Sequence, residues 1–175
     1  MFAERITKVQ NLMRSNNIDA LLLSVGADLP YFIGYEAMPL ERLTMLVIRD
    51  EGNPMLVIPQ LERARVAERP TIFNICEWGE TEDPIEIVAT ALAGSIRVAI
   101  GDTTWTRFTI ELLKRMPNID LLRANPITSQ LRSIKSSEEL DRLQQAANAV
   151  DKIADRLQNG QIELLGKTEK QVSEE

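Results

Sequence analysis

Apolar residues recur at helical spacing near the N-terminus and then change to short uninterrupted runs. Across residues 3–15 they stand three and four positions apart, which predicts an amphipathic helix that ends at Asn16 and Asn17. The run at residues 20–23 contains no polar position, which indicates a strand buried on both faces. Such a strand is typical of the centre of an α/β sheet.

The pattern then predicts a hairpin. Residues 24–34 fit a loop with a short helical turn, and residues 43–49 and 54–59 are two β-type runs. The polar stretch 50–53 between these runs suits a tight turn, so the two strands are expected to be antiparallel. A helix is predicted next over residues 60–69, because Pro70 cannot continue it.

Strand and helix patterns keep alternating through the second half. We expect strands at residues 72–76, 97–100 and 119–122, and helices from Pro84 to Leu92 and along the face marked by Trp105, Phe108, Leu112 and Met116. An acidic loop is expected at residues 77–83, around Trp78. The alternation predicts an α/β fold of three layers, with a mixed β-sheet flanked by helices on both sides.

The C-terminal part of the chain does not continue the alternation of strand and helix patterns. Ser136 and Glu139 form a Ser-x-x-Glu capping box, and an apolar stripe from Leu140 to Leu157 predicts one long helix that ends at Gly160. A polar tail follows, in which residues 167–169 indicate the start of another helix. An uncovered apolar stripe would make the chain self-associate.

Composition and charge limit the kinds of partner that the chain can bind. The chain has 175 residues, enough for one domain, and a net charge of −6, which disfavours binding to nucleic acid. No apolar run approaches the roughly 20 residues that span a bilayer, and the N-terminus lacks the apolar core of a secretion signal. We therefore expect no membrane partner and a cytoplasmic location.

The residue types exclude most hydrolytic sites. The sequence contains no histidine and one cysteine, so a Ser-His-Asp triad, a Cys-His pair or an HExxH zinc site cannot be built from it. Neither of the two common Gly-rich phosphate-binding motifs occurs. Cys76 stands in an apolar run, and we interpret it as a buried structural thiol.

Asp102 has both a functional and a structural interpretation. Asp102 follows a predicted strand and could be a carboxylate ligand of magnesium, but we favour a role with Thr103 in capping the helix near Trp105. Trp78 and Trp105 are interpreted as core or partly buried anchors.

The segment of residues 34–42 fits a purely structural interpretation poorly. It holds Tyr35, Glu36 and Arg42 between a buried strand and the hairpin. Arg42 could present its fork of donors to a carboxylate, and Tyr35 offers an apolar body with a polar tip. The alternative is an ordinary surface loop with an internal Glu–Arg pair, and both interpretations stay open.

Five motifs in order resemble the N-terminal part of one enzyme family. They are Asp-Ala-Leu-Leu-Leu from position 19, Tyr-Phe-Ile-Gly-Tyr from 31, Glu-Arg-Leu-Thr from 41, Pro-Met-Leu-Val-Ile-Pro from 54, and Leu-Arg-Ser-Ile-Lys-Ser-Ser-Glu-Glu-Leu from 131. In order and spacing they resemble the prolidase, Xaa-Pro aminopeptidase and creatinase family, over residues 6–159.

The resemblance implies a parent protein of two domains. Residues 1–134 would be the N-terminal domain, and residues 135–175, with the long helix, would begin a pita-bread catalytic domain absent from this chain. That catalytic domain would bind two divalent metals, manganese, cobalt or zinc, on two Asp, one His and two Glu. This segment itself would hold no catalytic residue, no metal and no cofactor.

The resemblance also implies a homodimer. The N-terminal domain of one subunit would lean over the active site of the other, and Tyr35, Glu36 and Arg42 would line the substrate rim. The partners would be its own catalytic domain, a second subunit and short proline-containing peptides. The expected function is the non-catalytic, gating part of an Xaa-Pro dipeptidase or aminopeptidase. The alternatives are the same part of a creatinase-type amidinohydrolase, or a free-standing interaction domain.

Overall fold

Residues 1–174 are described by a computed structural model. The chain divides into two compact units, Met1–Ser133 and Ile134–Glu175. The first unit contains α1 (Phe2–Ser15), β1 (Ala20–Leu23), α2 (Asp28–Ile33), β2 (Met45–Arg49), β3 (Met55–Pro59), the 3-10 helix η1 (Gln60–Arg65), β4 (Asn74–Trp78), α3 (Pro84–Ala91), β5 (Arg97–Ile100), α4 (Thr106–Arg115), β6 (Asp120–Arg123) and α5 (Asn125–Ser133).

The six strands form one mixed sheet in the order β4-β3-β2-β1-β5-β6. The predicted hairpin is present, since β2 and β3 are antiparallel, and β1 also pairs with β2 in antiparallel fashion. The pairs β3 with β4, β1 with β5 and β5 with β6 are parallel. The mixed sheet expected from the alternating pattern is therefore confirmed.

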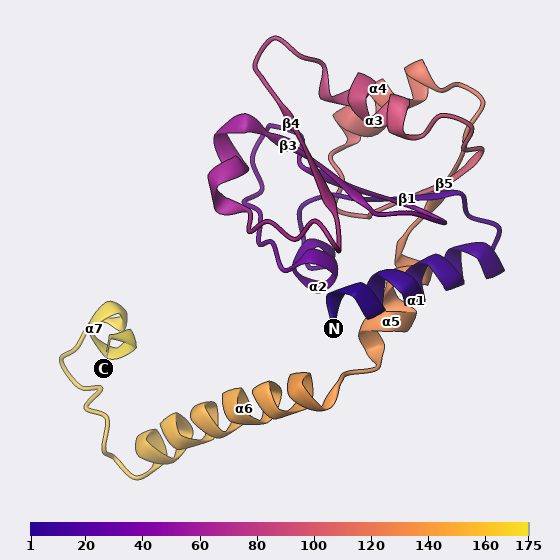
Figure 1. Cartoon of the computed structure of the whole chain (residues 1–175). Helices are drawn as coiled ribbons and strands as arrows, with labels where there is room; N and C mark the ends of the chain where they lie inside the picture. The colour runs from indigo at the N-terminus through magenta and orange to yellow at the C-terminus, as the bar shows by residue number, and fades with distance from the viewer. Residues whose placement is uncertain (175) are drawn as a thin grey trace. The chain divides into compact units, whose positions relative to one another are not determined.

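Helices cover both faces of this sheet (Figure 1). Helices α1, α2 and α5 contribute Val9, Phe32 and Ile127 to a buried cluster on one face. On the other face, α3 and α4 contribute Val88 and Leu112 to a second cluster. Burying each such side chain contributes about 1.5–3 kcal/mol, so the two clusters are the main source of stability.

Strand β1 separates the two clusters as the sequence predicts. Leu21 and Leu23 point into the first cluster, and Ala20 and Leu22 into the second. All four residues are fully buried. Only a central strand with helices on both faces requires an apolar residue at every position.

The helix expected over residues 60–69 is wrong in length and type. The chain forms the 3-10 helix η1, which ends at Arg65, and Val66 is extended with φ −97° and ψ 119°. Val66 is 5% exposed and belongs to the first core cluster. Burying this side chain in the sheet's core takes precedence over continuing the helix.

The strand expected at residues 72–76 begins two residues later. The backbone N–H groups of Ile72 and Phe73 both donate to the carbonyl of Arg69, which makes a turn before β4. The strand then continues to Trp78, whose indole Nε1 donates to the carbonyl oxygen of Leu43 at 3.0 Å. Trp78 is thus a buried anchor within a strand, not part of an acidic loop.

One expectation around α4 also fails. Asp102 does not cap α4, because Arg123 of β6 donates from Nε to its carboxylate at 3.1 Å and the α4 N-cap, Trp105, has no side-chain cap bond. Trp105 itself is 42% exposed and stacks on the buried ring of Phe108, with the ring centroids 6.3 Å apart, so it is a partly buried anchor and not a core residue. Helix α5 was not expected from the sequence pattern.

The second unit contains α6 (Ser137–Gln158) and α7 (Glu169–Ser173), the two helices predicted there. The capping box is present: the Ser136 hydroxyl accepts from the backbone N–H of Glu139 at 3.2 Å, and the Glu139 carboxylate accepts from the N–H of Ser136 at 2.8 Å. No described residue of α6 is buried.

Candidate functional site

The segment of residues 34–42 starts from a fixed point. Gly34 ends α2 with φ 71°, and a Cβ at this position would lie 2.6 Å from Nη1 of Arg69 and 2.8 Å from the ring of Phe2. Both the left-handed backbone and these contacts require glycine. Arg69 also donates to the carbonyl of Ile33 at 2.7 Å, which holds the last turn of α2. The direction in which the segment leaves the helix is therefore set.

Tyr35 is buried, at 5% exposure. Its hydroxyl donates to the Glu62 carboxylate at 3.3 Å, and Nη1 of Arg65 lies 3.2 Å from the same oxygen of Glu62. Burial, followed by the charge of Glu62, raises the pKa of Tyr35 to about 12. The side chain is therefore a neutral anchor between the segment and η1.

Arg42 lies at the other end of the segment, between two carboxylates. Its Nε and Nη2 lie 3.0 and 2.9 Å from Glu80, and its Nη1 lies 3.1 Å from Glu41. Its side chain is 34% exposed. The internal Glu–Arg pair of the structural interpretation is thus present, while part of the guanidinium still faces solvent.

Glu36 is the exposed member of the trio. It lines a hollow of about 430 Å³ together with residues that follow β1 and β5. Tyr35 and Arg42 line a different hollow of about 30 Å³, close to the volume of one water molecule. The structure thus brings Tyr35 and Arg42 together and places Glu36 on the other side of the segment.

Two further carboxylates stand near the ends of β1 and β5. Asp28 accepts from Nη1 of Arg132 at 3.0 Å, and burial raises the pKa of Asp28 although Arg132 opposes this. The hydrogen bond from Arg123 lowers the pKa of Asp102. Both acids are neutralised by arginines, so neither is a strong candidate for a ligand of a cation.

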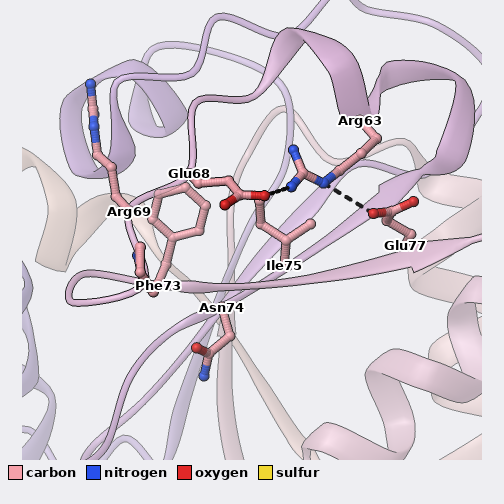
Figure 2. A pocket seen from close by; sticks show the side chains of 8 residues that line it. Arg63, Glu68, Arg69, Phe73, Asn74, Ile75 and Glu77 are labelled. Carbon is pink, nitrogen blue, oxygen red and sulfur yellow. Dashed lines mark hydrogen bonds and ion pairs between the residues drawn. The ribbon is translucent and has the colours of Figure 1, made fainter.

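A third hollow, of about 280 Å³, lies beside β4. Figure 2 shows Arg63 between Glu68 and Glu77, and its Nε lies 3.0 Å from Glu77. The guanidinium of Arg69 lies 4.6 Å from the ring centroid of Phe2. Charges here are paired within the fold, which indicates a structural role.

Cys76 is half-buried in β4, and burial raises the pKa of its thiol. A thiol with a raised pKa is a poor nucleophile, which agrees with the structural interpretation.

Two kinds of feature are absent from residues 1–174. Within this range no three His, Cys, Asp or Glu side chains gather closely enough to hold a metal ion. Within the same range no helix combines the length and the apolar character that crossing a membrane requires.

Residues 5–134 match the model of the Creatinase/Prolidase N-terminal domain. The chain belongs to this family. This match confirms the resemblance stated from the five motifs, and it covers the whole sheet and all helices of the first unit except the start of α1.

Individual relatives extend the match beyond the domain. The chain is 28% identical over 166 residues to the probable dipeptidase PepE of Mycobacterium tuberculosis, covering 90% of this chain and 43% of that protein. Dipeptidase PepE from Mycobacterium ulcerans superposes with a TM-score of 0.84 at 30% identity, over 98% of this chain and 46% of that chain. A prolidase from Thermococcus sibiricus gives 0.85 at 26%, over 98% and 47%. The chain spans less than half the length of each.

The sequence pattern of this creatinase/prolidase domain does not identify the residues that line the hollow together with Glu36. Thr103 and Trp105 line the same hollow but stand more than sixty positions away in the sequence. No spacing in the sequence signals this meeting, because it depends on the parallel pairing of β1 with β5, which forms only in the assembled sheet.

Proposed function

We propose that this chain is the N-terminal, non-catalytic part of a dipeptidase of the prolidase type. The full protein would hydrolyse the bond before proline in dipeptides or short peptides. The observation that carries this proposal is the superposition of nearly the whole chain, 98%, on 46% of a dipeptidase at a TM-score of 0.84. The relatives named as dipeptidase and prolidase favour this reaction over that of a creatinase.

The second unit fits the start of the catalytic domain in this proposal. Helix α6 has an apolar stripe in which Leu143 and Val150 are 55% and 65% exposed. Residues 135–175 would belong to that domain, and residues 1–134 to the N-terminal domain. The two divalent metals of the parent would be held entirely by the catalytic domain, because residues 1–174 offer no group that fits them. We place the protein in the cytoplasm.

The segment of residues 34–42 would border the active site of a second subunit in a homodimer. Its three side chains would take different parts. Glu36 is exposed and free to contact a substrate, and Arg42 offers the solvent-facing side of its guanidinium. Tyr35 is buried against Glu62 and would position the segment without touching substrate.

The test compares this chain with the full gene product in an assay of an Xaa-Pro dipeptide with added manganese. We expect turnover from the full protein and none from residues 1–175. Turnover by the shorter chain would contradict its non-catalytic role. An inactive full protein would contradict the proposed cleavage of the bond before proline.

The rim assignment is tested in the full protein with Glu36→Gln and Glu51→Gln. Glu51 is exposed in the β2–β3 turn and serves as a matched control. We expect Glu36→Gln to change KM for charged dipeptides about three- to fivefold, the scale of one exposed ion pair, and the control to change nothing. Equal kinetics for both variants would remove Glu36 from the rim.

A further inference from the structure

Strands β1 and β5 are parallel neighbours in the sheet. From β1 the chain continues toward one edge of the sheet, and from β5 it continues toward the other edge. After β1 it passes through α2 on one face to β2, and after β5 it passes through α4 on the other face to β6. In open α/β sheets, such a reversal opens a crevice outside the carboxyl ends of the two strands, where ligands bind.

The hollow beside Glu36 lies at this crevice. It is formed by the residues that follow β1, by Pro30 of α2, by the segment of residues 34–42, and by Thr103 and Trp105 after β5. Its volume of about 430 Å³ is in the range of small-ligand sites, about 300–1,000 Å³.

The loops that follow β1 and β5 meet closely in the lining of this hollow. Gly26 has φ +148°, and a Cβ at this position would lie 3.0 Å from Oγ1 of Thr103. A side chain here would push the loops apart. The glycine therefore keeps the wall after β1 against the wall after β5.

The lining has one uncompensated charge. Glu36 is exposed and makes no ion pair within residues 1–174, and no Lys or Arg lines the hollow. The nearby acids Asp28 and Asp102 are paired with Arg132 and Arg123. The charge of the lining therefore disfavours an anion, while a cation would meet one free carboxylate.

The remaining walls are apolar and aromatic. Trp105 is 42% exposed, and Pro30 and Pro39 stand among the lining residues. A carboxylate and an indole ring that line the same hollow suit a cation, because the aromatic ring attracts positive charge and the prolines accept an apolar body.

We propose that this hollow binds a small organic cation, an ammonium group on an apolar body. Glu36 pairs with the ammonium group, and Trp105 and the prolines contact the apolar part. This goes beyond the proposed function, because it requires neither a second subunit nor the catalytic half of the protein.

The test is an NMR titration of the 175-residue chain with leucinamide and with N-acetyl-leucinamide. At pH about 6.5 the amine of leucinamide is charged, while the acetylated compound is neutral. We expect saturable shifts at the amides of Gly26, Thr103 and Trp105 with leucinamide. The acetylated compound should bind about fivefold more weakly, the scale of one exposed ion pair.

Three variants assign the contacts. Glu36→Gln should weaken leucinamide three- to fivefold, to about the affinity of the acetylated compound. Trp105→Leu should weaken it about threefold through the lost cation–π contact. Glu41→Gln, in the same segment but outside the hollow, should leave the affinity unchanged. Spectra that are unchanged outside the hollow verify that each variant folds.

Several outcomes would overturn the proposal: no saturable shift, equal affinity for both compounds, shifts that map elsewhere, or an unaltered affinity in Glu36→Gln. Shifts that follow protein concentration instead of ligand would assign the hollow to a second copy and also overturn it. The titration measures binding and not turnover, so a negative titration does not contradict the proposed function. The peptidase assay measures turnover, so its failure does not contradict binding in the hollow.

Discussion

At the scale of single residues, Tyr35 shows how burial changes what a side chain can do. A tyrosine in a surface loop would offer its hydroxyl to a ligand, but here the hydroxyl faces Glu62 inside the fold. The neutral form is favoured because the phenolate would be both desolvated and next to a carboxylate. The residue therefore contributes to stability, and this contribution depends on pH.

The sign of that dependence follows from the raised pKa. An unfolded tyrosine titrates near pH 10, and folded Tyr35 at about 12. The contribution is complete below about pH 10 and is lost as pH rises from there toward 12. We expect stability measured by urea unfolding to fall over this window, and Tyr35→Phe to abolish that fall.

At neutral pH, Tyr35→Phe should cost about 1 kcal/mol, the net worth of one hydrogen bond. Titration of the ultraviolet absorbance of tyrosinate is the direct control, since the late-titrating tyrosine should be missing from the variant. An absorbance titration identical in both proteins would contradict the assignment.

Asp19 supports a second prediction. Its carboxylate accepts the backbone N–H groups of Ile96 at 2.7 Å and Arg97 at 2.8 Å, and these bonds lower its pKa. We expect Asp19→Ala to lower the free energy of unfolding by about 2 kcal/mol, because it leaves both donors unpaired.

The contribution of Asp19 is present above pH about 4, where the unfolded side chain is ionised, and is lost as pH falls through the lowered pKa. Asp19→Asn, which keeps one acceptor, is the matched control and should cost less. Equal stability of Asp19→Ala and the unchanged protein at pH 7 would refute the role.

At the scale of elements, the capping box of α6 is the clearest local signal. No described residue of this helix is buried, so its stability depends on local interactions. Ser136→Ala removes the side-chain acceptor for the N–H of Glu139 and should cost about 1 kcal/mol of helix stability.

Ser137→Ala is the control, since Ser137 is the first residue inside the helix and does not cap it. Circular dichroism should show a loss of helix for Ser136→Ala only. The same helix content in both variants would show that the box does not hold the helix start.

Much of the fold could be predicted from the sequence where one signal dominates. The all-apolar run of β1 and the Ser-x-x-Glu box of α6 allow only one interpretation. The elements that were missed depend on distant partners. The end of η1 is set by burial of Val66, and the start of β4 by its register with β3, in which Met55 pairs with Asn74.

The candidate site was less predictable for the same reason. The unusual composition of residues 34–42 identified the segment, but not that Tyr35 would turn inward toward Glu62. The capping role expected of Asp102 failed because Arg123, on the neighbouring strand, takes its carboxylate. Sequence spacing cannot reveal contacts that are made only when the sheet is assembled.

At the scale of the whole molecule, the exposed stripe of α6 should drive self-association. Leu143, Val150 and Ile153 are 55%, 65% and 57% exposed. Apolar side chains in a continuous stripe tend to be covered by another surface. We expect light scattering to give a mass above the 19.7 kDa of one chain.

Leu143→Glu combined with Val150→Glu should return the chain to a monomer, because charges in the stripe oppose its burial. Gln145→Glu adds a charge to the same helix away from the stripe and should leave association unchanged. A monomer for the unchanged chain, with α6 unfolded, would count against this prediction.

The central place of β1 has a consequence for synthesis on the ribosome. This strand emerges first, yet its neighbours are Leu46–Arg49 in β2 and Val98–Ile100 in β5. Until β5 has left the exit tunnel, one hydrogen-bonding edge of a wholly apolar strand stays open. The nascent chain therefore passes through an aggregation-prone interval of some fifty residues, between the emergence of β2 and that of β5, in which a chaperone would have most to shield.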